Sequence, residues 1–408
     1  YPFEKKLNEG KQFNSLIESI DIGGPSMVRA AAKNFRYVAV ITDPNDYKKL
    51  INEIEKNKGA TTLKFRSYLA TKAFQETSFY EANISNWLNE ANNIKNPNKK
   101  TINIKFKEKL RYGENPHQTG SIYTTANNKG FEKIYGKNLS YNNYNDIYAT
   151  LRILSSFPKN IGSAIIKHTN PCGASVEKDP LKSFQKSIDC DPKSAFGGIV
   201  GINSKLSERL AKKISKKFFE VIIFKGISKK SFDILKKKKN LILIDFSNFS
   251  FKKKLHLTDL NNFMMLQDND ELIINQKNFK FITKKKPKQK QIATLKFAFN
   301  MCKFVKSNAI VIAKDKSLIG IGAGQPSRLD SCKIAIEKAN TYSYNQINGA
   351  VAASDAFFPF PDAVETLSGF GIDTIIQPGG SIRDKEVVKV ANELGVSMIF
   401  TGSRHFKH

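Results

Sequence analysis

Residues 163–173 of the chain read SAIIKHTNPCG. The first four have the apolar character of the end of a buried strand, and the next seven place a lysine, a histidine, two small polar residues, a proline, a cysteine and a glycine in one turn. In an open α/β sheet, ligands bind beyond the carboxyl ends of strands, because backbone amides and side chains converge there. The stretch therefore predicts an α/β sheet with Lys167 and His168 side by side at a binding crevice.

The length and charge of the chain limit what it can be. Its 408 residues are too many for one ordinary core and predict two or three domains. The formal net charge of +29 comes mainly from lysines, many of them in runs such as residues 236–239, 252–254 and 284–286. A codon-composition bias is the simpler explanation of these runs, because asparagine and isoleucine are also abundant. The alternative is an anionic substrate or partner.

The four cysteines lie far apart and form no CxxC pair: Cys172, Cys190, Cys302 and Cys332. This spacing indicates neither a disulfide framework nor a zinc ribbon, and the expected location is cytoplasmic. No apolar run is long enough to span a bilayer, so a membrane is not an expected partner. The first residue is Tyr1 instead of methionine, and we expect a chain that is truncated at its N-terminus.

Helix and strand patterns alternate in the first hundred residues. A Gly-Gly-Pro sequence at residues 23–25 precedes an alanine-rich run and predicts a glycine turn that opens a helix. A strand is predicted at residues 37–42, followed by helices at 44–57 and 63–89. This order is typical of a parallel α/β domain, and the polar, proline-containing stretch at 93–102 marks its end.

Polar turns accompany the strands predicted in the rest of the chain. These turns lie at residues 110–118, 136–146, 167–173, 191–198, 304–308 and 354–362. The strands are predicted at residues 102–106, 163–166, 199–202, 221–224, 241–245, 309–313, 349–353, 374–377 and 396–400. The turn at 110–118 is either a binding loop or a solvated turn. Because the turns adjoin strand ends, we expect the candidate site residues to share one edge of a sheet.

Two later stretches bear on the kind of ligand. Residues 318–324 read LIGIGAG, and their glycines alternate as in a strand instead of matching GxGxxG before a helix, so a dinucleotide site is not expected. Residues 354–362 read SDAFFPFPD, with three phenylalanines among aspartates and prolines. This favours a loop that offers aromatic faces to a flat ligand, with a core cluster as the alternative.

Taken together, these stretches closely resemble the family of bifunctional purine-synthesis enzymes that join a 5-aminoimidazole-4-carboxamide ribonucleotide (AICAR) formyltransferase to an IMP cyclohydrolase. The matching stretches are YPFE at 1–4, DIGGPSMVRAAAKN at 21–34, RYGENPHQ at 111–118, KHTNPCG at 167–173, SAFGG at 194–198, VKSNAIV at 305–311, GIGAGQPSR at 320–328, SDAFFPFPD at 354–362, QPGGSIRD at 377–384 and TGSRHFKH at 401–408. They run through the whole chain in order, and only residues 205–290 match weakly.

The resemblance implies a fold and an assembly. It implies a partial methylglyoxal-synthase-like parallel α/β domain at residues 1–95. Two cytidine-deaminase-like α/β/α subdomains would follow, at residues 96–290 and 291–408. It also implies a homodimer whose formyltransferase sites are shared between the subunits.

The resemblance further implies transfer of the formyl group of 10-formyltetrahydrofolate to the 5-amino group of AICAR, which gives FAICAR and requires no metal. An aromatic amine is a poor nucleophile and must lose a proton as it attacks, so His168 fits a general base. Lys167 would hold the oxyanion or protonate the departing folate nitrogen, and Asn308 would orient the formyl group. The residues implied at the nucleotide are Arg111, Tyr112, Asn143 and Arg404, and those implied at the folate are Arg328, Phe357 and Asp362.

The cyclohydrolase closes the purine ring of FAICAR to IMP with loss of water. The resemblance implies Tyr1, Asp21 and Lys33 in that site. The stretch that precedes YPF in the family, with a phosphate-binding loop and a further lysine, is absent from this sequence. We therefore expect impaired cyclohydrolase activity, with formylated product and no IMP.

Two other classes of function compete with this one. A zinc nucleoside deaminase could use His168 and Cys172, but its signature also needs a glutamate and a second cysteine, where this chain has Asn170 and Ser175. A basic nucleic-acid-binding protein would interleave basic and aromatic residues on one face, and the lysine runs are nearly free of aromatics. Nucleic acid is therefore not an expected partner.

Overall fold

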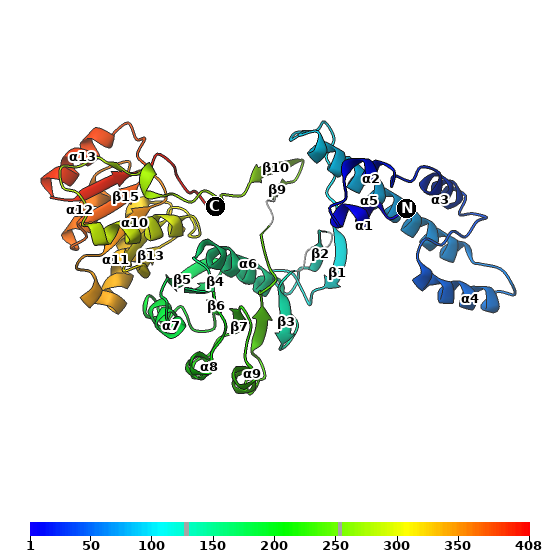
Figure 1. The fold of residues 1–408 in the computed structure, drawn as a ribbon, viewed down its shortest axis with the longest axis horizontal. Helices are drawn as coiled ribbons and strands as arrows, with labels where there is room; N and C mark the ends of the chain where they lie inside the picture. The colour runs from blue at the N-terminus through cyan, green and yellow to red at the C-terminus, as the bar shows by residue number, and fades with distance from the viewer. Residues whose placement is uncertain (126–129, 252–254) are drawn as a thin grey trace. The chain divides into compact units, whose positions relative to one another are not determined.

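The structure is a computed structural model that describes residues 1–125, 130–251 and 255–408. It divides into two compact units, one of Tyr1–Lys109 with Ser121–Asn128 and one of Leu110–Gly120 with Lys129–His408 (Figure 1). The stretch at residues 163–173 belongs to the second unit. The lysine run at residues 252–254 lies outside the described residues.

In its described part, the first unit consists of helices and one antiparallel strand pair. Its elements are α1 (Phe3–Asn8), α2 (Phe13–Ile17), α3 (Gly23–Lys33), the 3-10 helix η1 (Pro44–Asp46), α4 (Tyr47–Lys56), α5 (Leu63–Ala91), β1 (Lys105–Lys109) and β2 (Ser121–Thr124). Helix α5 begins where the hydroxyl of Thr62 accepts the amide of Phe65 at 3.2 Å, which is an N-cap. A small core joins α1 and α2 to α5 through Phe3, Leu16 and Trp87.

The helices predicted for the first unit are confirmed, but its strands differ from prediction. The strand predicted at 37–42 is wrong: among the described residues it pairs with no other strand, the amides of Tyr37 and Val38 donate to the Asn34 carbonyl that follows α3, and Tyr37 is 86% exposed. The strand predicted at 102–106 is displaced to β1. The parallel arrangement expected for residues 1–95 is therefore not seen in the described part of this unit.

Within the residues that the structure describes, the second unit is organised by one mixed sheet of 12 strands, which confirms the predicted α/β class. These strands are β3 (Glu132–Tyr135), β4 (Ser163–Lys167), β5 (Asn170–Ser175), β6 (Ile199–Ile202), β7 (Val221–Phe224), β8 (Ile242–Asp245), β11 (Lys280–Phe281), β12 (Ile310–Lys314), β13 (Ser317–Gly322), β14 (Val351–Ser354), β15 (Thr374–Gln377) and β16 (Ser397–Phe400). Their order across the sheet is β11-β16-β15-β14-β12-β13-β5-β4-β6-β7-β8-β3. Strands β6 to β8 and β14 to β16 run parallel, whereas β4–β5 and β12–β13 are antiparallel hairpins.

The same succession of elements occurs twice in this unit. Its helices are α6 (Tyr141–Ser156), α7 (Pro180–Asp189), α8 (Glu208–Ser215), α9 (Lys229–Leu235), α10 (Gln289–Cys302), α11 (Arg328–Ser343), α12 (Asp362–Gly369) and α13 (Asp384–Glu393), with 3-10 helices η2 (Gln276–Asn278) and η3 (Tyr344–Gln346). The first half runs β3-α6-β4-β5-α7-β6-α8-β7-α9-β8, and the second runs β11-α10-β12-β13-α11-β14-α12-β15-α13-β16. The halves meet where β5 and β13 pair antiparallel at Ser175 and Ser317, whose hydroxyl oxygens lie 2.8 Å apart.

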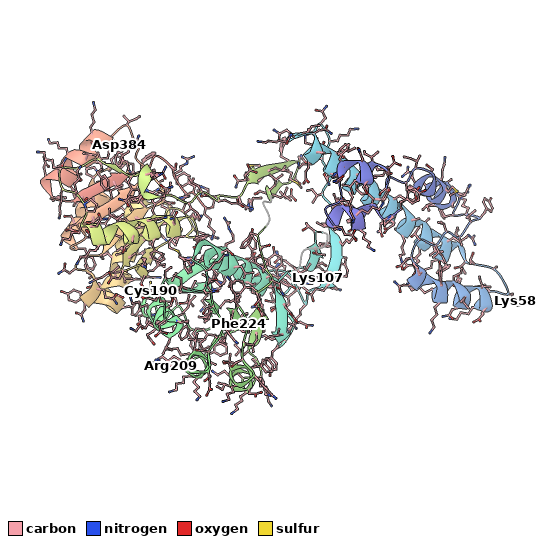
Figure 2. The ribbon with its side chains drawn as sticks, in the orientation of Figure 1. Lys58, Lys107, Cys190, Arg209, Phe224 and Asp384 are labelled. Carbon is pink, nitrogen blue, oxygen red and sulfur yellow. The ribbon has the colours of Figure 1, made fainter. Side chains whose placement is uncertain are left out.

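Helices cover both faces of the sheet. On one face, α6 and α10 share a single hydrophobic cluster with strands of both halves, including Ile147, Ile166, Leu295 and Val311. On the other face, α7, α8 and α9 cover the first half and α11, α12 and α13 cover the second (Figure 1). Phe224, marked in Figure 2, is fully buried in the first of these outer layers. Successive side chains of a strand point to opposite faces of the sheet, so each strand contributes apolar side chains to the core on both faces.

Close contact between helix and strand explains the glycines of the two hairpins. A Cβ atom on Gly173 would lie 2.0 Å from the Ser187 carbonyl oxygen of α7. In the second half, a Cβ on Gly322 would lie 1.7 Å from the Ser331 carbonyl oxygen of α11. Only a residue without a side chain fits there. The strand-like interpretation of residues 318–324 is confirmed by β13.

Two segments of the second unit differ from prediction. The polar loop predicted at 136–146 gives way to α6 at Tyr141, because Ser140 and Asn143 form a reciprocal capping box. The hairpin of β9 (Leu255–Leu260) and β10 (Phe263–Asp268) was not predicted, and within the described residues its strands pair only with each other. The other predicted strands of this unit are confirmed to within one or two residues.

Candidate active site

Lys167 and His168 lie at the tip of the β4–β5 hairpin. Lys167 pairs with Asn170, and His168 and Thr169 form the two-residue turn with φ of 51° and 61°. Positive φ at both positions is typical of a type I′ hairpin turn, which is unfavourable for residues with a side chain. Asp146 of α6 stabilises the turn, since its carboxylate accepts the amides of His168 (3.2 Å) and Thr169 (2.6 Å). The His168 side chain is thereby held exposed at the end of the sheet.

The side chain of Lys167 is fixed by the loop that follows α7. Its Nζ atom donates to the carbonyl oxygen of Phe196 at 2.9 Å. The loop is itself ordered by Asp191, whose Oδ1 accepts the amide of Ser194 at 2.9 Å. Two of the stretches that resemble the purine-synthesis family, residues 167–173 and 194–198, therefore meet at the ammonium group of Lys167. Lys167 keeps further donors for a ligand, because an ammonium has three.

A cavity of about 430 Å³ opens beside the hairpin. It is lined by Lys167, His168, Asn170, Pro171, Cys172, Asp191, Ser194, Ile321, Ala323, Gln325, Ile334 and Lys338. Lys338 of α11 forms a salt bridge of 2.8 Å with Asp191 in its wall. Burial opposes the charge of Asp191, but Lys338 and the Ser194 amide outweigh it and lower the pKa of that carboxyl. The cavity thus lies between the two halves of the sheet and is lined by both.

Asn308 is held rigidly at the start of β12. Its Nδ2 donates to the carbonyl oxygens of Gln325 (2.9 Å) and Pro326 (2.8 Å), and its Oδ1 accepts from Arg328 Nη2 at 2.6 Å. Arg328 is buried and also donates to Ser354 and to the fully buried carboxylate of Asp355. The hairpin is linked to this segment because the Lys306 amide donates to Asn170 Oδ1 at 2.9 Å. The structure therefore brings Lys167, His168 and Asn308 together at one edge of the sheet.

The residues implied at the nucleotide are dispersed over several elements of the second unit. The Arg111 guanidinium lies 5.4 Å from the centre of the Tyr112 ring, and that of Arg404 lies 4.5 Å from the Phe406 ring. Asn143 is buried, and its Nδ2 donates to Glu220 at 3.2 Å. None of these residues lines the cavity in the described part of the chain.

The residues implied at the folate lie near the ends of β14 and β13. Phe357 is 36% exposed and Phe360 is 47% exposed, whereas Phe358 between them is fully buried. Asp362 begins α12 and accepts the amide of Ala363 at 2.7 Å. The SDAFFPFPD stretch is thus both loop and core, since its phenylalanines divide between solvent and interior. Arg328 uses its guanidinium on Asp355, Ser354 and Asn308, so its place at the folate stays a prediction.

Two of the three residues implied in the cyclohydrolase meet in the first unit. The amino group of Tyr1 lies 3.2 Å from Asp21 Oδ2, and Asp21 Oδ1 accepts the amide of Gly24 at 2.9 Å. The hydrogen bond from this amide is the main cause of the lowered pKa of Asp21. Lys33 lies at the end of α3 and is exposed. Their catalytic roles stay predictions.

Cys172 is a packing residue in this structure. It is buried in the outer layer of the first half, and burial raises the pKa of its thiol to about 12. A thiol in this state supplies almost no thiolate near neutral pH. Within the described residues there is no cluster of three or more histidine, cysteine, aspartate or glutamate residues that could hold a metal ion, and no helix long and apolar enough to cross a membrane.

Sequence reasoning missed several residues at the site. They are Asp146 and Lys407, which contact the hairpin turn, Asp191 and Lys338 in the cavity wall, and Glu220 beside Asn143. Glu220 lies within an apolar stretch and carries no local signal of a site, whereas Asp146 ends the polar turn predicted at 136–146. Asp191 and Lys407 lie in or beside the matching stretches, so the motif boundaries could have indicated them.

Comparison with known proteins supports one family. The sequence profile described as AICARFT/IMPCHase bienzyme matches residues 31–338. The chain is 44% identical over 420 residues to the bifunctional purine biosynthesis protein PurH of Persephonella marina, a match that covers 100% of this chain and 80% of that protein. The proteins of the same name from Bradyrhizobium diazoefficiens and Aquifex aeolicus are 42% identical over 422 residues and 43% identical over 413 residues, with the same two coverages.

Proposed function

The chain belongs to the AICARFT/IMPCHase bienzyme family and is a bifunctional enzyme of purine biosynthesis, and we propose that Lys167 and His168 carry its formyl transfer. The reaction moves the formyl group of 10-formyltetrahydrofolate to the 5-amino group of AICAR and gives FAICAR. The cyclohydrolase reaction of the family then closes FAICAR to IMP. The observation that carries the proposal is the position of both side chains at the tip of one hairpin, beside a cavity of about 430 Å³.

In the proposed mechanism, His168 acts as the general base. The 5-amino group of AICAR attacks the formyl carbon and passes a proton to the imidazole as the new C–N bond forms. Lys167 stabilises the oxyanion of the tetrahedral intermediate. The intermediate collapses when its bond to the folate nitrogen breaks and that nitrogen takes up a proton. The exposed, turn-held imidazole suits this role, because it can approach a bound amine without moving the backbone.

The remaining roles extend this proposal outward from the hairpin. Asn308 orients the formyl group, and its fixed amide supports the assignment. Around the nucleotide and the folate we propose the residues that the family resemblance implies, namely Arg111, Tyr112, Asn143 and Arg404 for the first and Arg328, Phe357 and Asp362 for the second. The cosubstrate of the formyltransferase family is 10-formyltetrahydrofolate, and the proposed chemistry uses no metal.

The cyclohydrolase step is assigned to the first unit. We propose Tyr1, Asp21 and Lys33 as members of its site, as the family resemblance implies. For residues 1–95 we propose part of a methylglyoxal-synthase-like domain, although the described residues of this range form helices and no parallel strands. For residues 96–290 and 291–408 the proposed fold is cytidine-deaminase-like, which the repeated succession of elements supports. A cytoplasmic homodimer completes the proposal.

A substitution at His168 tests the assignment. The purified chain with His168→Ala is incubated with AICAR and 10-formyltetrahydrofolate, and FAICAR and IMP are measured separately. Formyl transfer is expected to be lost while AICAR still binds with similar affinity, because the base acts in the transition state. His256→Ala, at an exposed position on β9, is the matched control and is expected to keep full activity. An active His168→Ala enzyme would overturn the assignment.

A further inference from the structure

Lys407 makes an unusual set of contacts at the candidate site. It lies in the segment that follows β16, and its Nζ donates to the carbonyl oxygens of Thr169 (2.9 Å) and Phe304 (2.9 Å). Thr169 belongs to the hairpin turn of the first half of the sheet, and Phe304 follows α10 in the second half. One ammonium group therefore joins the two halves at the edge where the cavity opens.

The turn that carries His168 is clamped from two sides. The carboxylate of Asp146 accepts its two amides, and the ammonium of Lys407 donates to its carbonyl. Hydrogen bonds to charged groups are stronger than those between neutral groups, and they offset the backbone strain of two residues at positive φ. Both charged groups therefore stabilise the turn that carries His168.

The backbone of Lys407 is fixed by the neighbour of Asn308. The Ser307 amide donates to the Lys407 carbonyl oxygen at 2.8 Å, and the Lys407 amide donates to Ser307 Oγ at 3.2 Å. Ser307 Oγ in turn donates to Asp355, the partner of Arg328, which holds the side chain of Asn308. The backbone of Lys407 is therefore bound to the segment that carries Asn308, and its side chain is bound to the turn that carries His168.

We propose that Lys407 is a positioning residue for formyl transfer. It joins the hairpin turn at Thr169 to the segment at Ser307 and thereby holds His168 in position relative to Asn308. This inference rests on the proposed function of His168 and Asn308. Lys407 touches neither reacting group itself. Its effect is exerted through the Thr169 carbonyl, so its loss is expected to reduce turnover more than substrate binding.

The surroundings of Lys407 make this contact sensitive to pH. Burial lowers the pKa of its ammonium to about 8, and Arg152 of α6 and Lys306 before β12 act in the same direction, whereas Asp146 of α6 opposes them. A neutral amine is a weaker donor than an ammonium. The hydrogen bond to Thr169 is therefore strongest well below pH 8 and weakens as the pH rises through about 8.

The first test compares two lysines that donate to backbone carbonyls. Lys407→Met is expected to lower kcat by about 100-fold, the effect of a misplacement of about 1 Å, with the KM for AICAR changed by less than about threefold. The matched control is Lys314→Met, because Lys314 donates to the Asn348 carbonyl at 2.9 Å from the equivalent hairpin of the second half. The control is expected to keep its kcat. A kcat for Lys407→Met within about threefold of the wild-type value would overturn the proposal.

The second test separates positioning from a simple role in folding. Lys407→Arg keeps the positive charge and the donors but stays protonated to above about pH 12. It is expected to keep at least about a third of the wild-type kcat at pH 7. The wild-type enzyme is expected to lose kcat as the pH rises through about 8, and this loss should be absent from the profile of Lys407→Arg. An unchanged alkaline limb in Lys407→Arg would contradict the inference, whether or not Lys407→Met folds.

The two proposals fail in different ways. If His168→Ala is inactive while Lys407→Met and Lys407→Arg behave as the wild type, only the role of Lys407 falls. If His168→Ala is active, the proposed function itself falls. Binding of AICAR, measured by calorimetry on each variant, shows that the site is still formed.

Discussion

Replacement of Arg328 by methionine is expected to be the most destabilising change near the candidate site. The Arg328 side chain is 8% exposed, and its partner Asp355 is 0% exposed. Arg328→Met leaves this carboxylate buried without a cation, which destabilises a protein by about 3–5 kcal/mol. In a unit of this size, about 2 °C is lost per kcal/mol, so its melting temperature should fall by about 6–10 °C.

Scanning calorimetry on the full chain can measure this effect. The chain has a single tryptophan, Trp87 of α5, so tryptophan fluorescence follows the first unit and identifies its transition in the calorimetric trace. Arg328→Met should lower only the other transition. It should also reduce formyl transfer, because Asn308 loses the bond from Arg328 Nη2.

Two variants make the test specific. Arg209→Met changes an arginine that is exposed on α8 (Figure 2) and should alter the stability by less than about 0.5 kcal/mol. The double variant Arg328→Met with Asp355→Leu removes both charges and should recover at least about half of the lost stability, since replacing a buried ion pair with apolar residues is often neutral. A loss below about 1 kcal/mol in Arg328→Met, or a double variant no more stable than the single one, would refute the reasoning.

Two further predictions concern the hairpins and their helices. Gly322→Ala places a Cβ atom 1.7 Å from the Ser331 carbonyl oxygen and should destabilise the second unit by at least about 2 kcal/mol in the same calorimetric assay. Gly369→Ala, on α12 with no atom within 4 Å of the added Cβ, should leave it unchanged or stabilise it by up to about 1 kcal/mol. Asp146→Asn should lower kcat, because one of the two turn amides then meets an amide donor instead of a carboxylate oxygen. Burial raises the pKa of Asp146. On acidification, the wild-type rate should therefore begin to fall at a higher pH than it would if Asp146 had the pKa of an ordinary aspartate. An identical acid limb in the pH–rate profile of Asp146→Asn would exclude this residue as its source.

Most of the second unit follows from local pattern. Strands such as β6 and β7 are short, wholly apolar and bounded by polar or glycine-containing turns, and nothing competes with that interpretation. Lys167 and His168 could be predicted as a pair because they are adjacent in the chain and follow a buried strand. Their placement beside Asn308 required only that strand ends share an edge of the sheet.

The features that prediction missed depend on distant partners. The apolar stretch at 37–42 has the local pattern of a strand, but pairing needs a neighbour, and the described chain offers none. Lys407 and Thr169 are 238 residues apart, and no periodicity in either segment indicates that they meet. The loop at 136–146 was misjudged for a smaller reason, because asparagines that are typical of turns also serve as N-caps.

The two repeated hairpins have different surroundings at the seam between the halves. Since β5 and β13 run in opposite directions, the His168 turn and its counterpart at Asp315 and Lys316 lie at opposite ends of the shared seam. At one end the strands part and a cavity forms, while at the other Ser175 and Ser317 bond across the seam and the Val176 amide donates to the Lys316 carbonyl. The same kind of turn therefore has two different uses: in one half it carries His168 at the open end of the seam, and in the other it joins the two halves at the closed end.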